Sequence, residues 1–299
     1  MTALMPDVVC IGSVLWDVIG RSPVPMRLGA DVPGRITKVP GGVALNIAMT
    51  LSRFGVRPVL LSCVGRDADG DDLVTACQQL GLQTEFLYRS DDLATDSYMA
   101  IEGAGGLVAA IADAHSLEAA GARILAPLAD GRLGAAQAPF AGLVALDGNL
   151  TAGLLTDIAA SPLFAAADLR VAPASPGKAE RLLPLLTHPG ATLYVNLEEA
   201  GILCHSQFDG AGSAAQGLLD RGAVRVLVTD GGRACADGRA GDGVLLDSPP
   251  PVLVTRVTGA GDTFMAAHMM AERRGLPRPQ ALAQALRTAA DYVSGEIAP

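Results

Sequence analysis

The stretch VTGAGDTF at residues 257–264 decides how the rest of the chain is interpreted. It leads into an Ala- and Met-rich stretch ending at Arg274, which predicts a helix. Gly259 and Gly261 lack side chains, so backbone N–H groups can converge where the helix dipole favours an anion. Asp262 falls in the first helical turn, beside that anion. The pattern predicts a phosphate-binding turn next to a carboxylate base, or a glycine turn whose acid only caps the helix.

Upstream of this turn, short apolar runs alternate with helical periodicity. Residues 8–11 form a buried β-branched run, and a helix follows Gly41 and Gly42, with one apolar face that ends at Gly55. The same order predicts further strands and helices at 59–64 and 71–80, at 143–146 and 151–159, and a strand at 224–229. This alternation predicts a parallel sheet covered by helices.

One region departs from the alternation. Segments 97–101 and 107–111 are extended and flank the hairpin-like connection 102–106. Together with 35–39 they predict a small separate sheet. Such a sheet beside the core is expected to act as a lid, because closing it over a substrate excludes water.

Composition excludes several classes of function. The 299 residues carry 31 acidic and 22 basic side chains and a net charge of -9, which disfavours nucleic acid as a partner. The five cysteines are scattered without a Cys-x-x-Cys pair, so we expect reduced core thiols. No run reaches the ~18 apolar residues of a membrane span, and the N-terminus lacks a basic leader, so we expect a cytoplasmic location.

Three motifs, in order, resemble the ribokinase-like (PfkB) carbohydrate kinase family. They are GGVALN at 41–46, NLEE at 196–199 and GAGD at 259–262. The resemblance spans nearly the whole chain. It implies an α/β fold with a three-layer α/β/α core, a mostly parallel sheet and a small β-sheet lid. We expect a single kinase domain at 1–299, with lid strands from about 13–40 and 95–112.

The resemblance also implies roles for individual residues. Asp262 would be the catalytic base, and Gly259, Ala260 and Gly261 would supply the anion hole. Asn196 and Glu199 would help to place ATP phosphates and Mg²⁺, with Glu199 as the metal ligand. Thr229, Gly231 and Gly232 resemble the family's nucleotide-binding turn. Taken singly, Glu199 is a solvated helix charge and the Gly pair a tight turn.

The acceptor is expected to be a small sugar or nucleoside. Asp17, Gly41, Gly42 and Asn46 match the family's acceptor-binding positions and can hydrogen-bond adjacent hydroxyls. Further segments, including 95–101 and 147–150, resemble the pseudouridine kinase branch, for which Tyr98 and Asn149 join the predicted acceptor site. Tyr98 would cover a flat base, or would equally serve in core packing.

The same residues leave other interpretations open. Leu45, Ala172 and Val195 replace the arginine, aspartate and proline common in the pseudouridine branch, so a ribokinase- or fructokinase-like enzyme remains an alternative. A catalytically silent sugar or nucleoside sensor is another. A dinucleotide-binding oxidoreductase is disfavoured because no Gly-x-Gly-x-x-Gly follows the first strand. A monovalent cation and a homodimer are left open. The four histidines receive no role, and residues 272–274 are interpreted as a solvated helix end.

Overall fold

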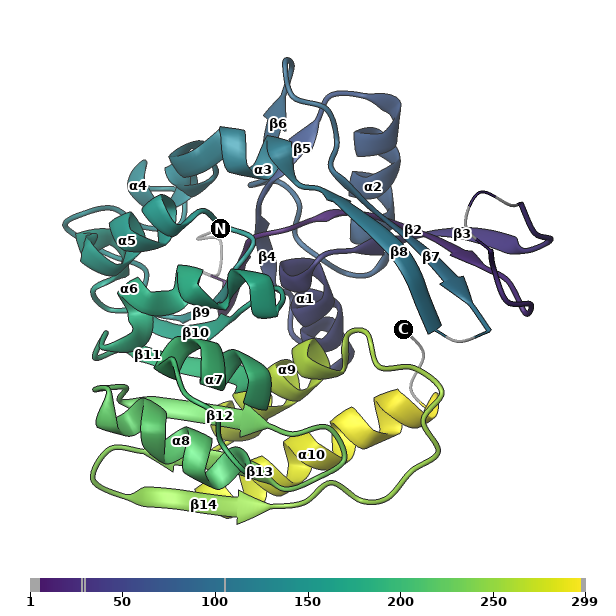
Figure 1. The fold of residues 1–299 in the computed structure, drawn as a ribbon. Coiled ribbons are helices and arrows are strands. Elements are labelled where there is room, and N and C mark those ends of the chain that lie inside the picture. The colour runs from purple at the N-terminus through teal and green to yellow at the C-terminus, as the bar shows by residue number, and fades with distance from the viewer. Residues whose placement is uncertain (1–5, 28, 30, 105, 297–299) are drawn as a thin grey trace.

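The computed structural model describes residues 6–27, 29, 31–104 and 106–296. An eight-stranded sheet has the order β14-β13-β12-β11-β10-β9-β1-β4, and a separate four-stranded sheet has the order β3-β2-β7-β8. Figure 1 shows the small sheet projecting from one side of the large one. The strands are β1 Val8–Ile11, β2 Leu15–Arg21, β3 Arg35–Gly41, β4 Val59–Leu61, β5 Cys63–Gly65, β6 Tyr88–Ser90, β7 Ser97–Gly103, β8 Gly106–Asp113, β9 Leu143–Asp147, β10 Asp168–Ala172, β11 Ala191–Asn196, β12 Arg225–Thr229, β13 Cys235–Arg239 and β14 Gly243–Asp247.

Helices cover both faces of the large sheet. They are α1 Val43–Arg53, α2 Ala68–Gln79, α3 His115–Ala120, α4 Ala126–Ala129, α5 Ala152–Ala160, α6 Leu183–Leu186, α7 Leu197–Cys204, α8 Ala211–Asp220, α9 Ala260–Arg273 and α10 Arg278–Ser294, with 3-10 turns at Gly121–Leu125, Pro162–Phe164 and Pro176–Leu182. In none of the described residues is a helix both long and apolar enough to cross a membrane.

The core lies on both faces of the large sheet, as strand β1 shows. All four residues of this strand are fully buried, and alternate side chains enter different apolar clusters: Val9 and Ile11 on one face, Val8 and Cys10 on the other. Side chains alternate across a strand, so a strand buried on both faces is apolar throughout. The second cluster includes α1 and α9, the helices that begin at the two predicted glycine motifs. The predicted three-layer α/β core is confirmed.

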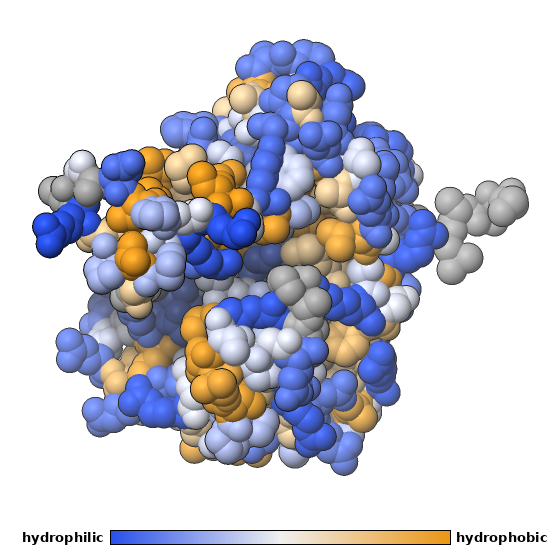
Figure 2. Space-filling view, turned by 90° about the vertical axis from the view of Figure 1, so that its right-hand side faces the viewer, coloured by the Kyte–Doolittle hydropathy of each residue, from blue (hydrophilic) through white to orange (hydrophobic). Residues whose placement is uncertain are grey.

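The second sheet is formed by the segments expected for the lid. β2 pairs with β3 antiparallel and with β7 parallel, and β7 pairs with β8. Several apolar side chains of this sheet face solvent, from Ile36 at 78% exposed to Ile101 at 40%. Figure 2 views the molecule from this side and shows apolar surface interspersed with polar surface around a hollow.

Two details of the predicted elements are wrong. The strand expected at 59–64 is two strands, since β4 pairs with β1 while β5 pairs with β6 in a separate small sheet. The large sheet also ends in two antiparallel strands, β13 and β14, which the alternation did not indicate. The cysteines are free, and Cys204 alone of the five is not fully buried.

Candidate active site

The predicted site residues gather at the carboxyl edge of the large sheet. Strands β4, β1, β9, β10, β11 and β12 are parallel, so their carboxyl ends lie together. Asp147 ends β9, Asn196 ends β11 and Thr229 ends β12. Ligands of open α/β sheets bind at this edge, so the fold brings polar groups from distant segments to one place.

The start of α9 has the geometry of an anion site. Gly259 is the N-cap with φ of 85°, and a β-carbon there would lie 2.6 Å from the Tyr292 hydroxyl. Glycine is therefore required. The Ala260 N–H donates to Val257 O, so Ala260 contributes no free donor to the predicted anion hole. Within the described residues, no hydrogen bond uses the N–H of Gly261 or of Asp262. The free amides at this helix start therefore exclude that of Ala260 and include that of Asp262, which the sequence did not indicate.

Asn46 and Asp262 meet across the start of two helices. The Asn46 Nδ2 donates to Asp262 Oδ2 at 2.8 Å, although the residues are 216 positions apart. The bond joins a predicted acceptor-binding residue directly to the predicted base. Among the described residues, no hydrogen bond to Asp262 Oδ1 is formed.

The electrostatic environment makes Asp262 unusually basic. Burial raises its pKa to about 7, and Asp147, Asp17 and Glu199 add to the rise, while the hydrogen bond from Asn46 opposes it. Burial also raises the pKa of Asp17 to about 6. A carboxylate with a pKa near neutrality is a stronger base than an ordinary aspartate, which suits it to accept a proton.

The residues predicted to bind the acceptor lie on or beside the lid sheet. Gly41 packs on Asp17, because a β-carbon at Gly41 would lie 2.1 Å from Asp17 Oδ2. Tyr98 is the register partner of Asp17 across β2 and β7, and its pKa is raised by burial and then by the charge of Asp17. Gly42 has φ of 103° and has no space for a side chain beside Ser13. Asp17, Gly41, Gly42 and Tyr98 therefore lie together.

Asn196 and Glu199 form the capping box of α7. The Glu199 N–H donates to Asn196 Oδ1 at 2.9 Å, and the Asn196 N–H donates to Glu199 Oε2 at 2.8 Å. Glu199 is 6% exposed, so it is not the solvated charge of the alternative interpretation. Burial raises its pKa to about 7.

The donor set around Glu199 fits Mg²⁺. The described residues contain no cluster of three or more His, Cys, Asp or Glu side chains able to hold a metal alone. Mg²⁺ is commonly held by one or two carboxylates plus waters and phosphates, so a protein cage is unnecessary. Glu199 Oε1 accepts no hydrogen bond from a described residue and would be the ligand atom.

The nucleotide-binding turn predicted at Thr229 adjoins a pocket. Thr229 is the register partner of Asn196 across β11 and β12. A pocket of about 1000 Å³ is lined by both residues, by Gly231 and by α7. Gly232 is exposed and does not line it. Thr229 and Gly231 therefore lie together with Asn196.

One residue beside the predicted Asn149 was missed by the sequence analysis, namely Asp147. Asp147 is fully buried and accepts from the N–H of Ser13 at 2.7 Å and from its hydroxyl at 2.6 Å. Asn149 donates to the Ser13 hydroxyl and accepts from Lys178, so it is tied into this network. The available signal was an aspartate ending an apolar strand, where burial needs hydrogen-bond partners.

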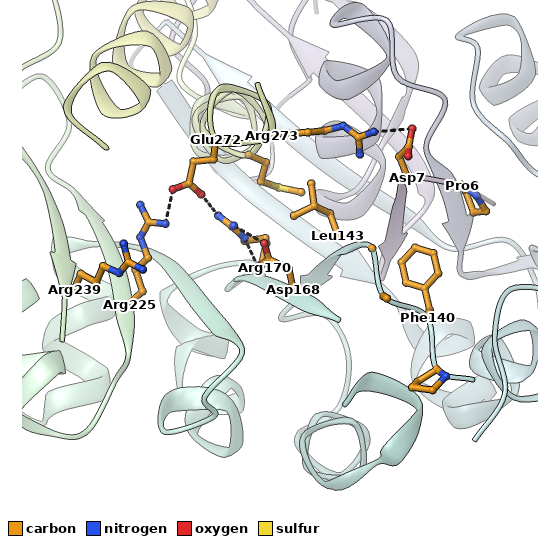
Figure 3. A pocket seen from close by; sticks show the side chains of 14 residues that line it. Pro6, Asp7, Phe140, Leu143, Asp168, Arg170, Arg225, Arg239, Glu272 and Arg273 are labelled. Carbon is orange, nitrogen blue, oxygen red and sulfur yellow. Dashed lines mark hydrogen bonds and ion pairs between the residues drawn. The ribbon is translucent and has the colours of Figure 1, made fainter. Parts of the chain in front are cut away.

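The amino edge of the sheet holds a second pocket, of about 840 Å³. It contains none of the predicted site residues. Figure 3 shows its charges meeting one another: Arg273 pairs with Asp7 at 2.8 Å, and Arg170 pairs with Asp168 at 2.6 Å and with Glu272 at 2.5 Å. Within each pair the opposite charges neutralise each other, and the pairs stabilise this edge.

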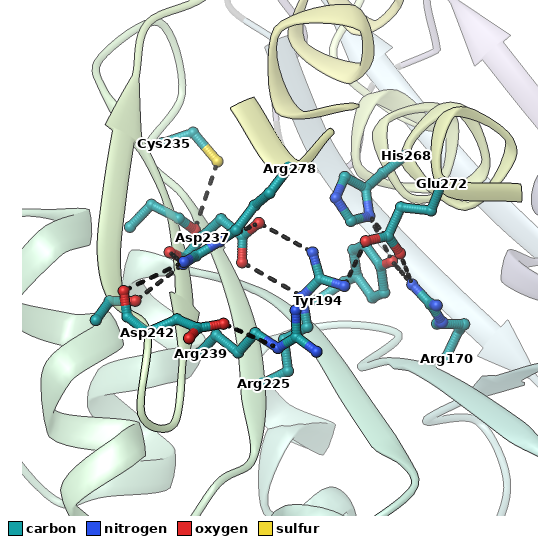
Figure 4. A network of polar contacts seen from close by, with 12 residues as sticks. Arg170, Tyr194, Arg225, Cys235, Asp237, Arg239, Asp242, His268, Glu272 and Arg278 are labelled. Carbon is teal, nitrogen blue, oxygen red and sulfur yellow. Dashed lines mark hydrogen bonds and ion pairs between the residues drawn. The ribbon is translucent and has the colours of Figure 1, made fainter. Parts of the chain in front are cut away.

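Glu272 is central to this edge, so its interpretation as a solvated helix end is wrong. Its side chain is 20% exposed and pairs with both Arg170 and Arg225. Burial alone would raise its pKa, but His268, Arg170 and Arg225 outweigh that effect and lower the pKa to about 2. Figure 4 shows the network continuing through Tyr194 to His268, which is buried. The sequence pattern could not indicate this network, because Arg170, Tyr194 and Arg225 come from three different strands.

The fold and this site together define a kinase of small carbohydrates. The model of the "pfkB family carbohydrate kinase" matches residues 5–295, so the chain belongs to that family.

Individual relatives agree with the family. The chain is 30% identical over 283 residues to the pseudouridine kinase of Escherichia coli K12, covering 90% of this chain and 85% of that protein. It is 27% identical to the ribokinase of Mus musculus, covering 87% of this chain and 80% of that protein. The crystal structure of a putative ribokinase II of E. coli in complex with ATP and Mg²⁺ has a TM-score of 0.77 at 18% identity, covering 97% of this chain and 93% of the other. It shares the fold.

Proposed function

We propose that this protein transfers the γ-phosphoryl group of ATP to a hydroxyl of a sugar or nucleoside, with Asp262 as the base. The observation that carries the proposal is the position of Asp262. It lies at the start of α9, is oriented by Asn46 at 2.8 Å and adjoins amides that have no acceptor among the described residues.

The reaction follows from these groups. The acceptor hydroxyl gives its proton to Asp262 as its oxygen forms a bond to the γ-phosphorus. The bond from that phosphorus to the β–γ bridging oxygen breaks, and ADP leaves with the electron pair. The N–H groups of Gly261 and Asp262, at the positive end of the helix dipole, offset negative charge on the transferring group. Positioning and charge stabilisation supply most of the catalysis.

ATP and Mg²⁺ are the proposed co-substrate and cofactor. Asn196, Thr229, Gly231 and Gly232 would contact the nucleotide, and Glu199 would hold the metal directly or through water. Bound Mg²⁺ neutralises phosphate charge. The family membership and the fold shared with a ribokinase II described with ATP and Mg²⁺ support this assignment.

For the acceptor we propose pseudouridine, which would become pseudouridine 5'-phosphate. The support is the similarity to the E. coli pseudouridine kinase, together with Tyr98 beside Asp17, where a ring and a ribose hydroxyl would lie close together. Asp17, Gly41, Gly42, Asn46 and Asn149 are the proposed acceptor contacts. A ribokinase- or fructokinase-like specificity is the second candidate, favoured by the similarity to a mouse ribokinase.

The experiment is an ATP-consumption assay with pseudouridine, ribose, fructose and adenosine as acceptors. We expect ADP formation with pseudouridine at the highest kcat/KM. Turnover of ribose or fructose alone would replace pseudouridine by the second candidate. Binding of an acceptor without ADP formation would indicate a sensor and overturn the kinase proposal.

Three further properties are part of the proposal. Exposed apolar side chains on the lid sheet, such as Ile36 and Ile111, favour a homodimer formed through that sheet. Whether a monovalent cation activates the enzyme is measured by replacing K⁺ with a tetraalkylammonium ion. The cytoplasmic location stays a prediction.

A further inference from the structure

Helix α1 begins without a capping side chain of its own. Its N-cap is Gly42, which makes no side-chain hydrogen bond to the helix. Unpaired amides at a buried helix start are costly, so acceptors must come from elsewhere. The Val43 N–H donates to the Ser13 hydroxyl at 2.9 Å, the Leu45 N–H to Ser13 O at 3.3 Å, and the Ala44 N–H to Asp147 Oδ2 at 3.1 Å. The ends of β1 and β9 therefore cap this helix.

Asp147 is the centre of this arrangement. It is 0% exposed, and its Oδ2 accepts from the Ser13 N–H, the Ser13 hydroxyl and the Ala44 N–H. Its Oδ1 accepts from the Asn149 N–H at 2.5 Å. A β-carbon at Gly12 would lie 2.5 Å from the Asp147 carboxyl carbon, so the chain of β1 passes directly against it. One carboxylate thus joins β1, β9 and α1.

The contacts continue to the proposed base. Asn46 lies in the first turn of α1, where its N–H donates to Gly42 O at 2.8 Å, and its side chain donates to Asp262. Whatever fixes the start of α1 therefore also fixes the orientation of Asp262. The glycine turn at Gly41 and Gly42, which packs on Asp17, is held by the same contacts.

We propose that Asp147 is a positioning residue of this site: it fixes the acceptor-side glycine turn and the start of α1, and it adds negative charge around Asp262. The inference rests on the proposed function for its kinetic consequences. Its structural part, the coupling of Asp147 to the Asn46–Asp262 pair, is measurable without turnover.

The negative charge of Asp147 acts on the pKa of Asp262. Burial is the main cause of the raised pKa of Asp262, and Asp147 is the first of the charged groups that raise it further. The groups that face Asp262 from neighbouring elements are Asp17 of β2, Asn46 of α1, Asp147 of β9, Glu199 of α7 and Tyr292 of α10. Replacing Asp147 by a neutral group therefore lowers the pKa of Asp262.

The test compares Asp147→Asn with Ser13→Ala. The first removes the charge and leaves at least one backbone donor without an acceptor, whereas the second removes a capping hydroxyl and keeps the charge. Assayed with ATP and pseudouridine or ribose, both variants are expected to lose kcat by about 10- to 100-fold, because misplacing catalytic groups by about 1 Å costs that much. The expected change in KM for ATP is smaller.

The decisive readout is the NMR chemical shift of the Asn46 side-chain amide, measured as a function of pH. The amide signal is assigned by its loss in Asn46→Ala. In the wild type we expect a midpoint near pH 7, because burial raises the pKa of Asp262 to about 7. We expect the midpoint to move to lower pH in Asp147→Asn and to stay in place in Ser13→Ala. An unmoved midpoint in Asp147→Asn overturns the charge role, and an unchanged kcat in Ser13→Ala overturns the positioning role.

The outcomes separate this inference from the proposed function. If the wild type turns over none of the acceptors, the proposed function fails, while the NMR titration still tests the coupling to Asp147. If Asp147→Asn does not fold, as judged by circular dichroism, Ser13→Ala carries the test of positioning. Normal turnover in that variant then overturns the inference.

Discussion

The carboxyl and amino edges of the large sheet both bury charged groups, but they arrange them in opposite ways. At the carboxyl edge, burial raises the pKa of Asp262 and of Glu199 to about 7, and no described arginine or lysine forms an ion pair with either. At the amino edge, Glu272 lies between two arginines and its pKa falls to about 2. The two edges thus differ in charge pairing: the carboxylates proposed for catalysis are unpaired, and those at the amino edge are paired.

The largest expected effect is at the carboxyl edge. Replacing Asp262 by Asn keeps the shape of the side chain and removes the base, so we expect kcat to fall by about 10² to 10⁴. ATP affinity, measured by calorimetry, should change little, because the backbone amides remain.

Asp157→Asn serves as the control, since Asp157 is exposed on α5 and makes no contact with the site. Near-normal turnover of Asp262→Asn would contradict the assignment of the base.

The next effect is at the amino edge. Glu272→Ala leaves Arg170 and Arg225 each with one carboxylate instead of two. Breaking a buried pair by removing one partner commonly costs 3–5 kcal/mol, and we expect about 3 kcal/mol here from urea unfolding.

The exposed Glu180→Ala is the matched control and should change stability by less than about 0.5 kcal/mol. If the two variants were equally stable, the amino edge would not have the structural role described above.

The smallest effect tests the opposite directions of the pKa shifts at the two edges. The folded-state pKa of Asp262 lies above its ordinary value, so its favourable contribution at low pH is lost as pH rises toward about 7. The pKa of Glu272 lies below its ordinary value, so its contribution is lost as pH falls toward about 2.

Asp262→Asn should therefore raise Tm by about 2–4 °C at pH 8 and by a smaller amount at pH 5, because the loss begins above the ordinary pKa of 3.8 and is complete above about 7. Scanning calorimetry at both pH values measures this. A variant that is less stable at pH 8 would show that ionised Asp262 stabilises the fold.

The sequence predicted the parts of the molecule that depend on local pattern. The helix after Gly42, the turn at Gly259 and the lid strands follow from glycine positions and apolar periodicity, and the structure contains all of them. It could not indicate that the Ala260 amide is used within its own turn, because that depends on the φ of Gly259.

Contacts between distant residues were also beyond the sequence. Glu272 was assigned to solvent because a helix end rich in charge is usually exposed. Its partners Arg170 and Arg225 are 102 and 47 positions away, and only the sheet order brings them together. Asp147 was missed for the same reason, since it caps a helix 103 positions earlier in the chain.

The capping of α1 by Asp147 has a consequence for biosynthesis. During synthesis from the N-terminus, the residues of α1 leave the ribosome well before those of β9. The Ala44 amide therefore has no Asp147 carboxylate to bind until 103 further residues have been made. Closing such a long loop is slow and entropically costly. The proposed acceptor side of the site is therefore assembled late, and a nascent chain truncated before residue 147 has the helix sequence but lacks the carboxylate that accepts from the Ala44 amide.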